Sequence, residues 1–325
     1  MRLYRHLLRL VYSLGLDLAF LCLFGAIFLA VRAHYGGHLT LRHGTTLVSG
    51  TAFVVMCLVS LIMKRSMRPA LQMVRDWVPL LLILLIYSNF HDLTYLIRPS
   101  TVDDSLRAWD VRLFRVEPTL WLQPYVRPWL TEYMTFCYAL FFVFPTIVLV
   151  RLYLRGDFVL FREVGVALSL GFYLGLVGYA LVPAIGPRYA FPQEFAVPLQ
   201  GYWLTDRAAV AWSALQKVQR DCFPSLHTAI TAIALVYLVR FRARWRWGGV
   251  LLAICTPLIV SLWASTIYLR YHYAVDVVAG FALAALCTLL APALCRFHYD
   301  KARPWVVAAQ VEAPLPSPAA SIAER

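Results

Sequence analysis

Long apolar runs separated by short polar segments dominate this chain and restrict what it can fold into. Of its 325 residues, 61% are hydrophobic and only 14% are charged, against about 25% charged residues in soluble domains. A helix that crosses a bilayer needs about 20 apolar residues. Runs of about this length lie at residues 13–33, 47–63, 77–97, 131–150, 163–183, 225–240, 248–268 and 272–294.

Each of these eight runs predicts a transmembrane helix. Lipid offers no hydrogen-bond partner to an open backbone, and no run has the alternating pattern of a barrel strand. We therefore expect an all-α integral membrane protein, a polytopic helical bundle of about eight transmembrane helices. Pro145 and Pro257 lie inside runs and predict local kinks. Gly171 and Gly175, with Gly178 nearby, predict close packing of the fifth run on a neighbouring helix.

The net charge of +13 is explained by membrane topology. The basic residues are dispersed among the loops, which argues against a nucleic-acid partner. Short cytoplasmic loops collect Lys and Arg, and the strongest excess lies in Arg240-Phe-Arg-Ala-Arg-Trp-Arg246. Eight spans then place both termini in the cytoplasm and the loop at 184–223 outside. We expect a multi-pass protein of a plasma, inner or equivalent membrane, with no obligate protein partner and with its first span retained rather than cleaved.

Two segments outside the spans have distinct patterns. Residues 103–116 begin with Asp103 and Asp104, which are helix-cap candidates, and carry apolar residues at helical spacing with arginines between them. This pattern predicts an amphipathic helix in the outer interface. The Ala/Pro/Ser-rich stretch 309–325 predicts a disordered cytoplasmic tail. Residues 1–308 are expected to form a single polytopic catalytic domain.

Two motifs at the openings of apolar runs contain the candidate catalytic residues. His227 follows a turn-forming Phe-Pro-Ser and stands in the first turn of its predicted helix, beside backbone N–H groups that attract anions. His272 opens the last run, and Asp276 follows at the i+4 position on the same helix face. A carboxylate so placed fixes the tautomer of an imidazole, so His272 is the candidate nucleophile or base. His227 is expected to face the same compartment as a general acid.

These groups suggest phosphoryl chemistry at the outer membrane surface. A bound phosphate needs positive charge and oriented donors, and Arg188, Arg270 and the N–H groups around Ser225 are the candidates. Arg188 has the alternative of reaching only to lipid headgroups. Asp and Glu residues do not cluster with the histidines along the chain, so we expect no metal and no other cofactor.

Other polar residues give weaker signals. Asn89, His91 and Asp92 lie in the outer part of the third run, where they either hydrogen-bond between helices or line a substrate cleft. Six of the seven cysteines lie in or beside apolar runs and are expected to be small core residues. Cys222 lies in a polar loop, and the sequence indicates no partner for it. The sequence assigns no role to the acids Glu132, Asp206 and Asp221.

The histidine motifs carry a resemblance to a known family. Phe-Pro-Ser-Leu-His227-Thr and Tyr-His272-Tyr-Ala-Val-Asp276 resemble the second and third motifs of the phosphatidic acid phosphatase type 2 superfamily. The Ser-Leu-His form is similar to the inositol phosphorylceramide synthase branch. The His-Tyr-x-x-Asp form occurs in that branch and in sphingomyelin synthases. The resemblance implies the six-helix core of the superfamily within this bundle.

The first motif is less complete. Pro183-Ala-Ile-Gly-Pro-Arg188 is similar to the version found in the same branch. The common form has a Lys seven residues before its Arg, where this chain has Leu181. The common third motif has an Arg six residues before its His, where this chain has Thr266, and Arg270 is the candidate replacement. These departures favour the transferase-like branch over a broad-range lipid phosphatase.

The resemblance implies a two-step reaction and leaves its acceptor open. His272 attacks a lipid-linked phosphate and becomes a phosphohistidine, while His227 protonates the departing alcohol and then deprotonates the acceptor. A lipid or polyol acceptor makes the chain a phosphotransferase, inositolphosphotransferase-like, with a lipid phosphate as donor. A water acceptor makes it a phosphatase, for example of a polyprenyl pyrophosphate. A non-enzymatic lipid-binding or lipid-transporting protein is the alternative of another class.

Overall fold

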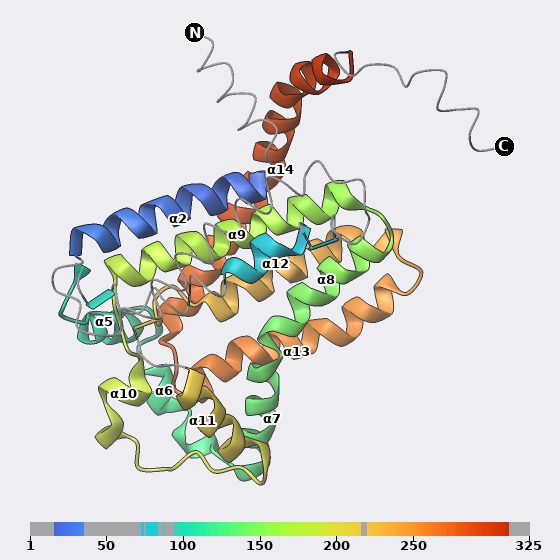
Figure 1. Cartoon of the computed structure of the whole chain (residues 1–325). Coiled ribbons are helices and arrows are strands. Elements are labelled where there is room, and N and C mark those ends of the chain that lie inside the picture. The colour runs from blue at the N-terminus through green and yellow to red at the C-terminus, as the bar shows by residue number, and fades with distance from the viewer. Residues whose placement is uncertain are drawn as a thin grey trace.

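A computed structural model of the chain describes residues 16–35, 73–74, 76–83, 87, 94–95, 97–215 and 220–311. Within these residues every regular element is a helix and none is a strand, as the all-α prediction requires (Figure 1). The α-helices are α2 (Leu16–Tyr35), α5 (Asp103–Phe114), α6 (Pro118–Trp121), α7 (Pro128–Ala139), α8 (Val143–Leu154), α9 (Phe158–Leu181), α10 (Pro187–Ala190), α11 (Leu204–Leu215), α12 (Leu226–Phe241), α13 (Gly248–Tyr268) and α14 (Ala274–Val311). Short 3-10 helices are η2 (Gln123–Tyr125), η3 (Leu140–Phe142), η4 (Pro192–Glu194) and η5 (Arg242–Arg244).

The long helices agree with the predicted membrane spans. In the described part of the chain, five segments are long and apolar enough to cross a bilayer: Pro128–Leu154, Phe158–Leu181, Leu226–Arg244, Gly248–Tyr268 and Ala274–His298. They coincide with the last five predicted runs, and α2 overlaps the first. The second run lies outside the described residues, and the third is described only in part. A helical membrane bundle is therefore confirmed, and the number of eight spans stays a prediction.

Helix α12 occupies the centre of the bundle. It packs against α8, α9, α13 and α14 (Figure 1). Ala229, Ile230, Ile233 and Tyr237 on this helix have no exposed surface. An apolar helix buried on all sides has no amphipathic stripe, which is why the sequence predicts a buried or membrane helix but not its neighbours.

The glycines of α9 allow it to approach α12 closely, as the G-x-x-x-G pattern predicts. A Cβ atom added at Gly171 would lie 3.0 Å from the side chains of Ile230 and Ile233. One added at Gly175 would lie 2.5 Å from Leu226, and one at Gly178 would lie 2.3 Å from Pro224. The three glycines thus lie along the first turns of α12 and the Pro224 turn before it. Because they have no side chains, α9 can pack directly against the segment that carries the first histidine motif.

The predicted kinks differ in outcome. The segment Pro128–Leu154 changes from α-helix to the 3-10 helix η3 at Leu140–Phe142, directly before Pro145. Proline cannot donate to the preceding turn, so the interruption falls where a kink was expected. Helix α13 continues through Pro257 as one helix.

Helix α14 packs against the first turn of α12 through Gly280. A Cβ atom at this position would lie 2.6 Å from the carbonyl oxygen of Ser225 and 2.9 Å from Thr228. The Gly280→Ala change would force the two helices apart, at a cost of about 1–3 kcal/mol. We expect a lower unfolding midpoint in detergent. Gly165→Ala in α9 is the matched control, because no atom lies within 4 Å of its added Cβ and alanine favours a helix by about 1 kcal/mol. An unchanged midpoint for Gly280→Ala would contradict this packing.

Helix α5 forms where the amphipathic pattern predicts it. Trp109 and Leu113 are half exposed, whereas Leu106 is buried, as an interfacial helix requires; its position in the outer interface stays a prediction. The predicted capping role of Asp103 and Asp104 was wrong. Val102 is the N-cap residue, and no side chain caps the helix. At the other end of the chain, α14 continues to Val311, and the rest of the predicted tail lies outside the described residues.

Candidate active site

The Phe-Pro-Ser turn ends in a capped helix start. The hydroxyl of Ser225 accepts a hydrogen bond from the backbone N–H of Thr228, 3.3 Å away, and so caps α12. The backbone N–H of Ser225 donates to the carbonyl oxygen of Asp276 at 3.1 Å. This bond joins the two histidine motifs through the backbone. Ser225 was predicted to bind phosphate, and the described contact of its hydroxyl is the helix cap.

The structure brings the two predicted histidines together. His227 lies in the first turn of α12, and His272 lies in the loop between α13 and α14, where its backbone N–H donates to Thr266 O. The Nε2 atom of His272 is 3.4 Å from the Nδ1 atom of His227, and the ring centroids are 5.5 Å apart. A substrate atom that contacts one imidazole is therefore within reach of the other imidazole.

Asp276 is buried behind His272. Its Oδ2 atom lies 3.4 Å from His272 Nδ1 and accepts a hydrogen bond from the backbone N–H of Tyr273 at 2.8 Å. The i to i+4 spacing thus produces the predicted imidazole–carboxylate pair. Asp276 has no exposed surface, and its Oδ1 atom has no hydrogen-bond partner among the described residues.

Cys222 is a member of this site that sequence reasoning missed. Its Sγ atom donates to Asp276 Oδ2 at 2.9 Å and to the carbonyl oxygen of Tyr271 at 3.3 Å, and it lies 3.7 Å from His272 Nδ1. The sequence indicated no partner for this cysteine, and the structure places it against Asp276 and Tyr271. Burial, and then the negative charge of Asp276, raise the pKa of the Cys222 thiol well above its usual value. The position five residues before His227 in a polar loop was the available signal.

Aromatic rings fix the orientation of His227. Tyr138 stacks on its imidazole with centroids 4.3 Å apart, and Phe141 lies 4.5 Å away on a tilted plane. Tyr138 lies at the end of α7 and Phe141 lies in η3, where the helix is interrupted before Pro145. In the sequence these residues look like any other part of an apolar run, so nothing indicated their contact with the histidine.

The histidines open into a pocket where α12 and α14 begin. Its lining residues are Tyr138, Ile185, Tyr189, Asp221, Cys222, His227, Tyr271 and His272. Asp221, to which the sequence assigned no role, therefore faces the reacting region, and its carboxylate accepts a hydrogen bond from Tyr87. The pocket combines a carboxylate, three phenol hydroxyls and two imidazoles. Such a set can move protons and hold a polar group at the end of an apolar substrate.

Arg188 lies beside this pocket. Its guanidinium donates to the hydroxyl of Tyr271 at 3.2 Å and lies 5.0 Å from the centre of that ring, which lines the pocket. Its turn depends on Gly186, which has a φ of +85°. A Cβ atom at Gly186 would lie 2.3 Å from the carbonyl oxygen of Tyr271. Only glycine allows this φ and this approach together, so the Gly-Pro-Arg turn can dock on the His272 loop.

Arg270 is held by the loop that follows η4. It donates to the carbonyl oxygen of Val197 at 2.6 Å, and its guanidinium lies 4.1 Å over the ring of Phe195. Burial, and then the positive charge of Arg188, lower the pKa of Arg270 to about 10, so the group stays charged near neutral pH. Arg188 and Arg270 remain predicted phosphate ligands, although neither is among the residues that line the histidine pocket.

Two carboxylates of α5 hold the backbone around the site. Asp103 accepts hydrogen bonds from the N–H groups of Ile185 and Gly186 and from the hydroxyl of Tyr273. Asp110, seven residues further along the same helix, accepts hydrogen bonds from the N–H groups of Ala274 and Val275 at 2.9 and 2.8 Å. Those two N–H groups are the first of α14 and have no partner within their own helix.

Asp103 therefore fixes the Gly-Pro-Arg turn, and Asp110 fixes the start of α14 just after His272. Burial raises the pKa of Asp110 to about 6, while the two N–H groups oppose the rise and the charge of Asp276 adds to it. The signal in the sequence was a pair of acids seven residues apart on an otherwise interfacial helix. Asp103 was predicted as a cap candidate and Asp110 was assigned no role, because the partners of both lie more than 80 residues away.

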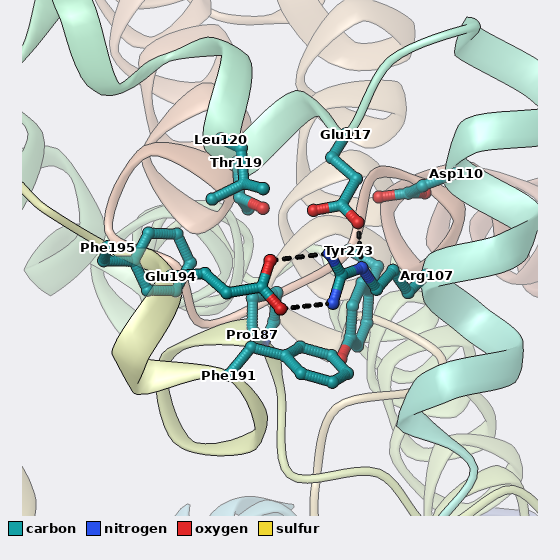
Figure 2. A pocket seen from close by; sticks show the side chains of 10 residues that line it. All are labelled: Arg107, Asp110, Glu117, Thr119, Leu120, Pro187, Phe191, Glu194, Phe195 and Tyr273. Carbon is teal, nitrogen blue, oxygen red and sulfur yellow. Dashed lines mark hydrogen bonds and ion pairs between the residues drawn. The ribbon is translucent and has the colours of Figure 1, made fainter.

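A second pocket is lined by side chains of α5, of the segment 117–120 and of the residues around η4 (Figure 2). Arg107 of α5 forms an ion pair with Glu117 and a two-point hydrogen bond with Glu194, both distances in the latter being 2.6 Å. Its guanidinium also lies 4.5 Å over the ring of Phe191. These contacts fasten η4 and the residue before it to α5, and Figure 2 shows Asp110 and Tyr273 beside them.

The remaining predicted residues contribute less. Asn89, His91 and Asp92 lie outside the described residues, so their place in the cleft stays a prediction. Glu132 accepts hydrogen bonds from the backbone N–H groups at Tyr202, Trp203, Leu204 and Thr205. It therefore organises the start of α11 and does not face the histidines.

Comparison with known proteins identifies the family. The chain matches the model described as the PAP2 superfamily over residues 106–290, more than half of its length. It is also 28% identical over 124 residues to the phosphoinositol dihydroceramide synthase of Bacteroides thetaiotaomicron. That alignment covers 35% of this chain and 39% of the synthase, so the chain spans less than half the length of the curated relative it matches. No solved structure matches the chain.

The family match contains the parts that build the histidine pocket. Residues 106–290 include most of α5, the Gly-Pro-Arg turn, Cys222, His227, His272 and Asp276. The imidazole pair at the ends of membrane-length helices, with His272 buried and His227 partly buried, is consistent with this assignment. Its five apolar helices are those of a multi-pass membrane protein, and the chain therefore belongs to the PAP2 superfamily.

Proposed function

We infer that the chain transfers a phosphoryl group, or a phosphate with its headgroup, from a lipid donor to an alcohol through a phosphohistidine on His272. The observation that carries this proposal is the 3.4 Å separation between His272 Nε2 and His227 Nδ1, with Asp276 on the opposite side of the His272 ring. One imidazole is thus backed by a carboxylate, and the other faces its reactive nitrogen. This is the arrangement expected of a nucleophile and its acid–base partner.

The proposed first step forms the phosphohistidine. Asp276 accepts a hydrogen bond from the Nδ1–H group of neutral His272, and this tautomer has its lone pair on Nε2. The Oδ2–Nδ1 distance of 3.4 Å is long for a hydrogen bond, and such contacts commonly shorten when substrate binds. The lone pair attacks phosphorus, a nitrogen–phosphorus bond forms, and the bond to the donor oxygen breaks. His227, protonated at this stage, gives its proton to the departing oxygen.

The proposed second step reverses these roles. An acceptor hydroxyl gives its proton to His227, its oxygen attacks phosphorus, and the bond to His272 Nε2 breaks. Arg188, which lies over Tyr271 at the rim of the pocket, is the proposed ligand of the phosphate oxygens. The N–H groups at the start of α12 add oriented donors. Arg270, bound to Val197 and Phe195, is proposed to act on phosphate through its charge while it positions the loop that follows η4.

A transferase is favoured over a phosphatase by two observations. The relative with 28% identity is named a synthase. The chain also lacks the Lys and Arg that common phosphatase motifs have at the positions of Leu181 and Thr266. The hydroxyl of Thr266 donates to Trp263 O within its own helix, so this position supplies nothing to a phosphate. A lipid or polyprenyl phosphate phosphatase is the second candidate.

A donor–acceptor experiment distinguishes these functions. Purified protein in vesicles is supplied with phosphatidylinositol or phosphatidic acid labelled in the phosphate, with and without dihydroceramide as the acceptor. We expect label to appear in a new lipid only when the acceptor is present. Inorganic phosphate released at the same rate with and without acceptor would identify a phosphatase. Folded protein that yields neither product would favour a lipid-binding or transport protein.

We also propose that the termini are cytoplasmic and that the site opens on the extracytoplasmic face. His227 lies at the start of α12, and the basic η5 segment Arg242–Arg244 follows its other end, so one spanning helix separates the site from the most basic loop. Single cysteines at the exposed positions Tyr202 and Ala243 should react with an impermeant reagent from opposite sides. Reaction of both from the same side would reject this topology.

A further inference from the structure

A second chemistry is available to the buried cluster behind the catalytic histidine. The described residues contain one group of three metal-ligating side chains whose donor atoms lie within 4.8 Å of one another: Cys222, His272 and Asp276. Sγ and Oδ2 are 2.9 Å apart, Oδ2 and Nδ1 are 3.4 Å apart, and Sγ and Nδ1 are 3.7 Å apart. All three residues are buried.

These donors match the preferences of zinc. Zinc binds thiolate, imidazole and carboxylate in tetrahedral sites with bonds of about 2.0–2.3 Å. Donors at the corners of such a tetrahedron are separated by about 3.3–3.6 Å. The Oδ2–Nδ1 distance of 3.4 Å and the Sγ–Nδ1 distance of 3.7 Å are close to this range, whereas the hydrogen-bonded Sγ–Oδ2 distance of 2.9 Å is shorter and would lengthen on metal binding. A second observation also points to a ligand. Asp276 Oδ1 is buried without a hydrogen-bond partner among the described residues, which is costly unless something satisfies it.

We propose that Cys222, His272 and Asp276 form an inhibitory site for a thiophilic divalent metal ion, Zn²⁺ by its chemistry. The ion binds the Nδ1 atom of His272, the side of the ring that faces Asp276. One proton leaves the Cys222 thiol for solvent. The proton on Nδ1 is displaced to Nε2, because a neutral imidazole keeps one proton and the metal now occupies the other nitrogen.

The consequence rests on the proposed function of His272. The Nε2 atom that faces His227 no longer has its lone pair and cannot attack phosphorus. Asp276 is bound to the metal and no longer holds the ring in the reactive tautomer. The ion reaches the cluster through the histidine pocket, because Cys222 and His272 both line it. The Asp221 carboxylate in the same pocket favours the approach of a cation.

Metal binding is measured without reference to activity. Co²⁺ is added to purified metal-depleted protein, and the absorption of a cobalt–thiolate bond is followed and then displaced with Zn²⁺. We expect one ion per chain in the wild-type protein and a loss of the thiolate absorption in Cys222→Ser. Cys287→Ala is the matched control, because Cys287 is a buried cysteine of α14, outside the cluster. It should keep the absorption unchanged.

Two results would overturn the site. One is the absence of cobalt–thiolate absorption in wild-type protein, which needs no variant to fold. The other is unchanged absorption in Cys222→Ser.

If binding is found, the rate of phosphoryl transfer is measured with buffered Zn²⁺, and each protein is compared with its own metal-free rate. We expect at least about a tenfold loss in wild-type protein, reversed by a chelator, and little change in Cys222→Ser. Binding without inhibition would reject the switch while leaving the metal site, and absence of any metal-free turnover would instead count against the proposed function.

Discussion

Replacement of His272 by alanine is expected to abolish both phosphorylation of the protein and product formation. His272 Nε2 is the nitrogen that faces His227, and its ring is backed by Asp276, so no other described side chain offers a nucleophile with this support. Removing a covalent nucleophile typically costs at least about 10³-fold in rate. We expect transfer from a labelled lipid donor to fall by at least that factor.

The measurement separates the chemical loss from a loss of structure. Protein is incubated with labelled donor, denatured in alkali, which preserves phosphohistidine, and counted; product is quantified in parallel. His34→Ala, at an exposed position near the end of α2, is the control and should retain labelling and turnover. The unfolding midpoint of His272→Ala is compared with the wild type. Turnover that survives in a folded His272→Ala protein rejects the nucleophile assignment.

Replacement of His227 by glutamine is expected to produce a different defect. A general acid contributes about 10²–10⁴ in rate, so transfer from a natural lipid donor should fall by about this factor. A donor that is a phosphate ester of a nitrophenol releases nitrophenolate, which leaves without needing a proton. With such a donor, the first step in His227→Gln should be nearly normal, whereas the second step still lacks a base for the acceptor.

The signature is a burst. His227→Gln should release about one equivalent of nitrophenolate per chain and then stall as the phosphohistidine form, whereas His272→Ala should give no burst with either donor. Stopped-flow absorbance measures the amplitude. Equal losses with both donors would show that His227 acts by supporting the structure, since its ring packs between Tyr138 and Phe141, and would remove it from the role of general acid.

Some parts of this protein follow from the sequence because they depend on local pattern. The run 248–268 coincides with α13, since length and apolar composition decide whether a segment crosses a bilayer. The imidazole–carboxylate pair of His272 and Asp276 follows from helical spacing. The prediction that His227 and His272 lie at the same end of the bundle followed from the alternating directions of consecutive spans, and it required only the last three helices to be predicted correctly.

Other parts could not be predicted because they join residues distant in the chain. The hydrogen bond from Cys222 to Asp276 spans 54 positions, and a thiol in a loop carries no mark of its partner. Asp103 stands where a helix cap is expected, yet its carboxylate binds N–H groups 82 and 83 positions away. Arg270 was predicted to bind phosphate because of its charge, whereas its burial against Phe195 and Val197 depends on the loop after η4, which has no sequence signature.

The carboxylates of α5 determine how small a functional fragment of this protein can be. A fragment reduced to the five long helices, beginning near Pro128, would contain both imidazoles and the aspartate but none of the acceptors that α5 provides. The N–H groups of Ile185, Gly186, Ala274 and Val275 would be left without these partners, at a cost of about 1–3 kcal/mol each where they stay buried. A minimal unit must therefore begin upstream of Val102, even though every side chain assigned to the chemistry lies more than 80 residues further along.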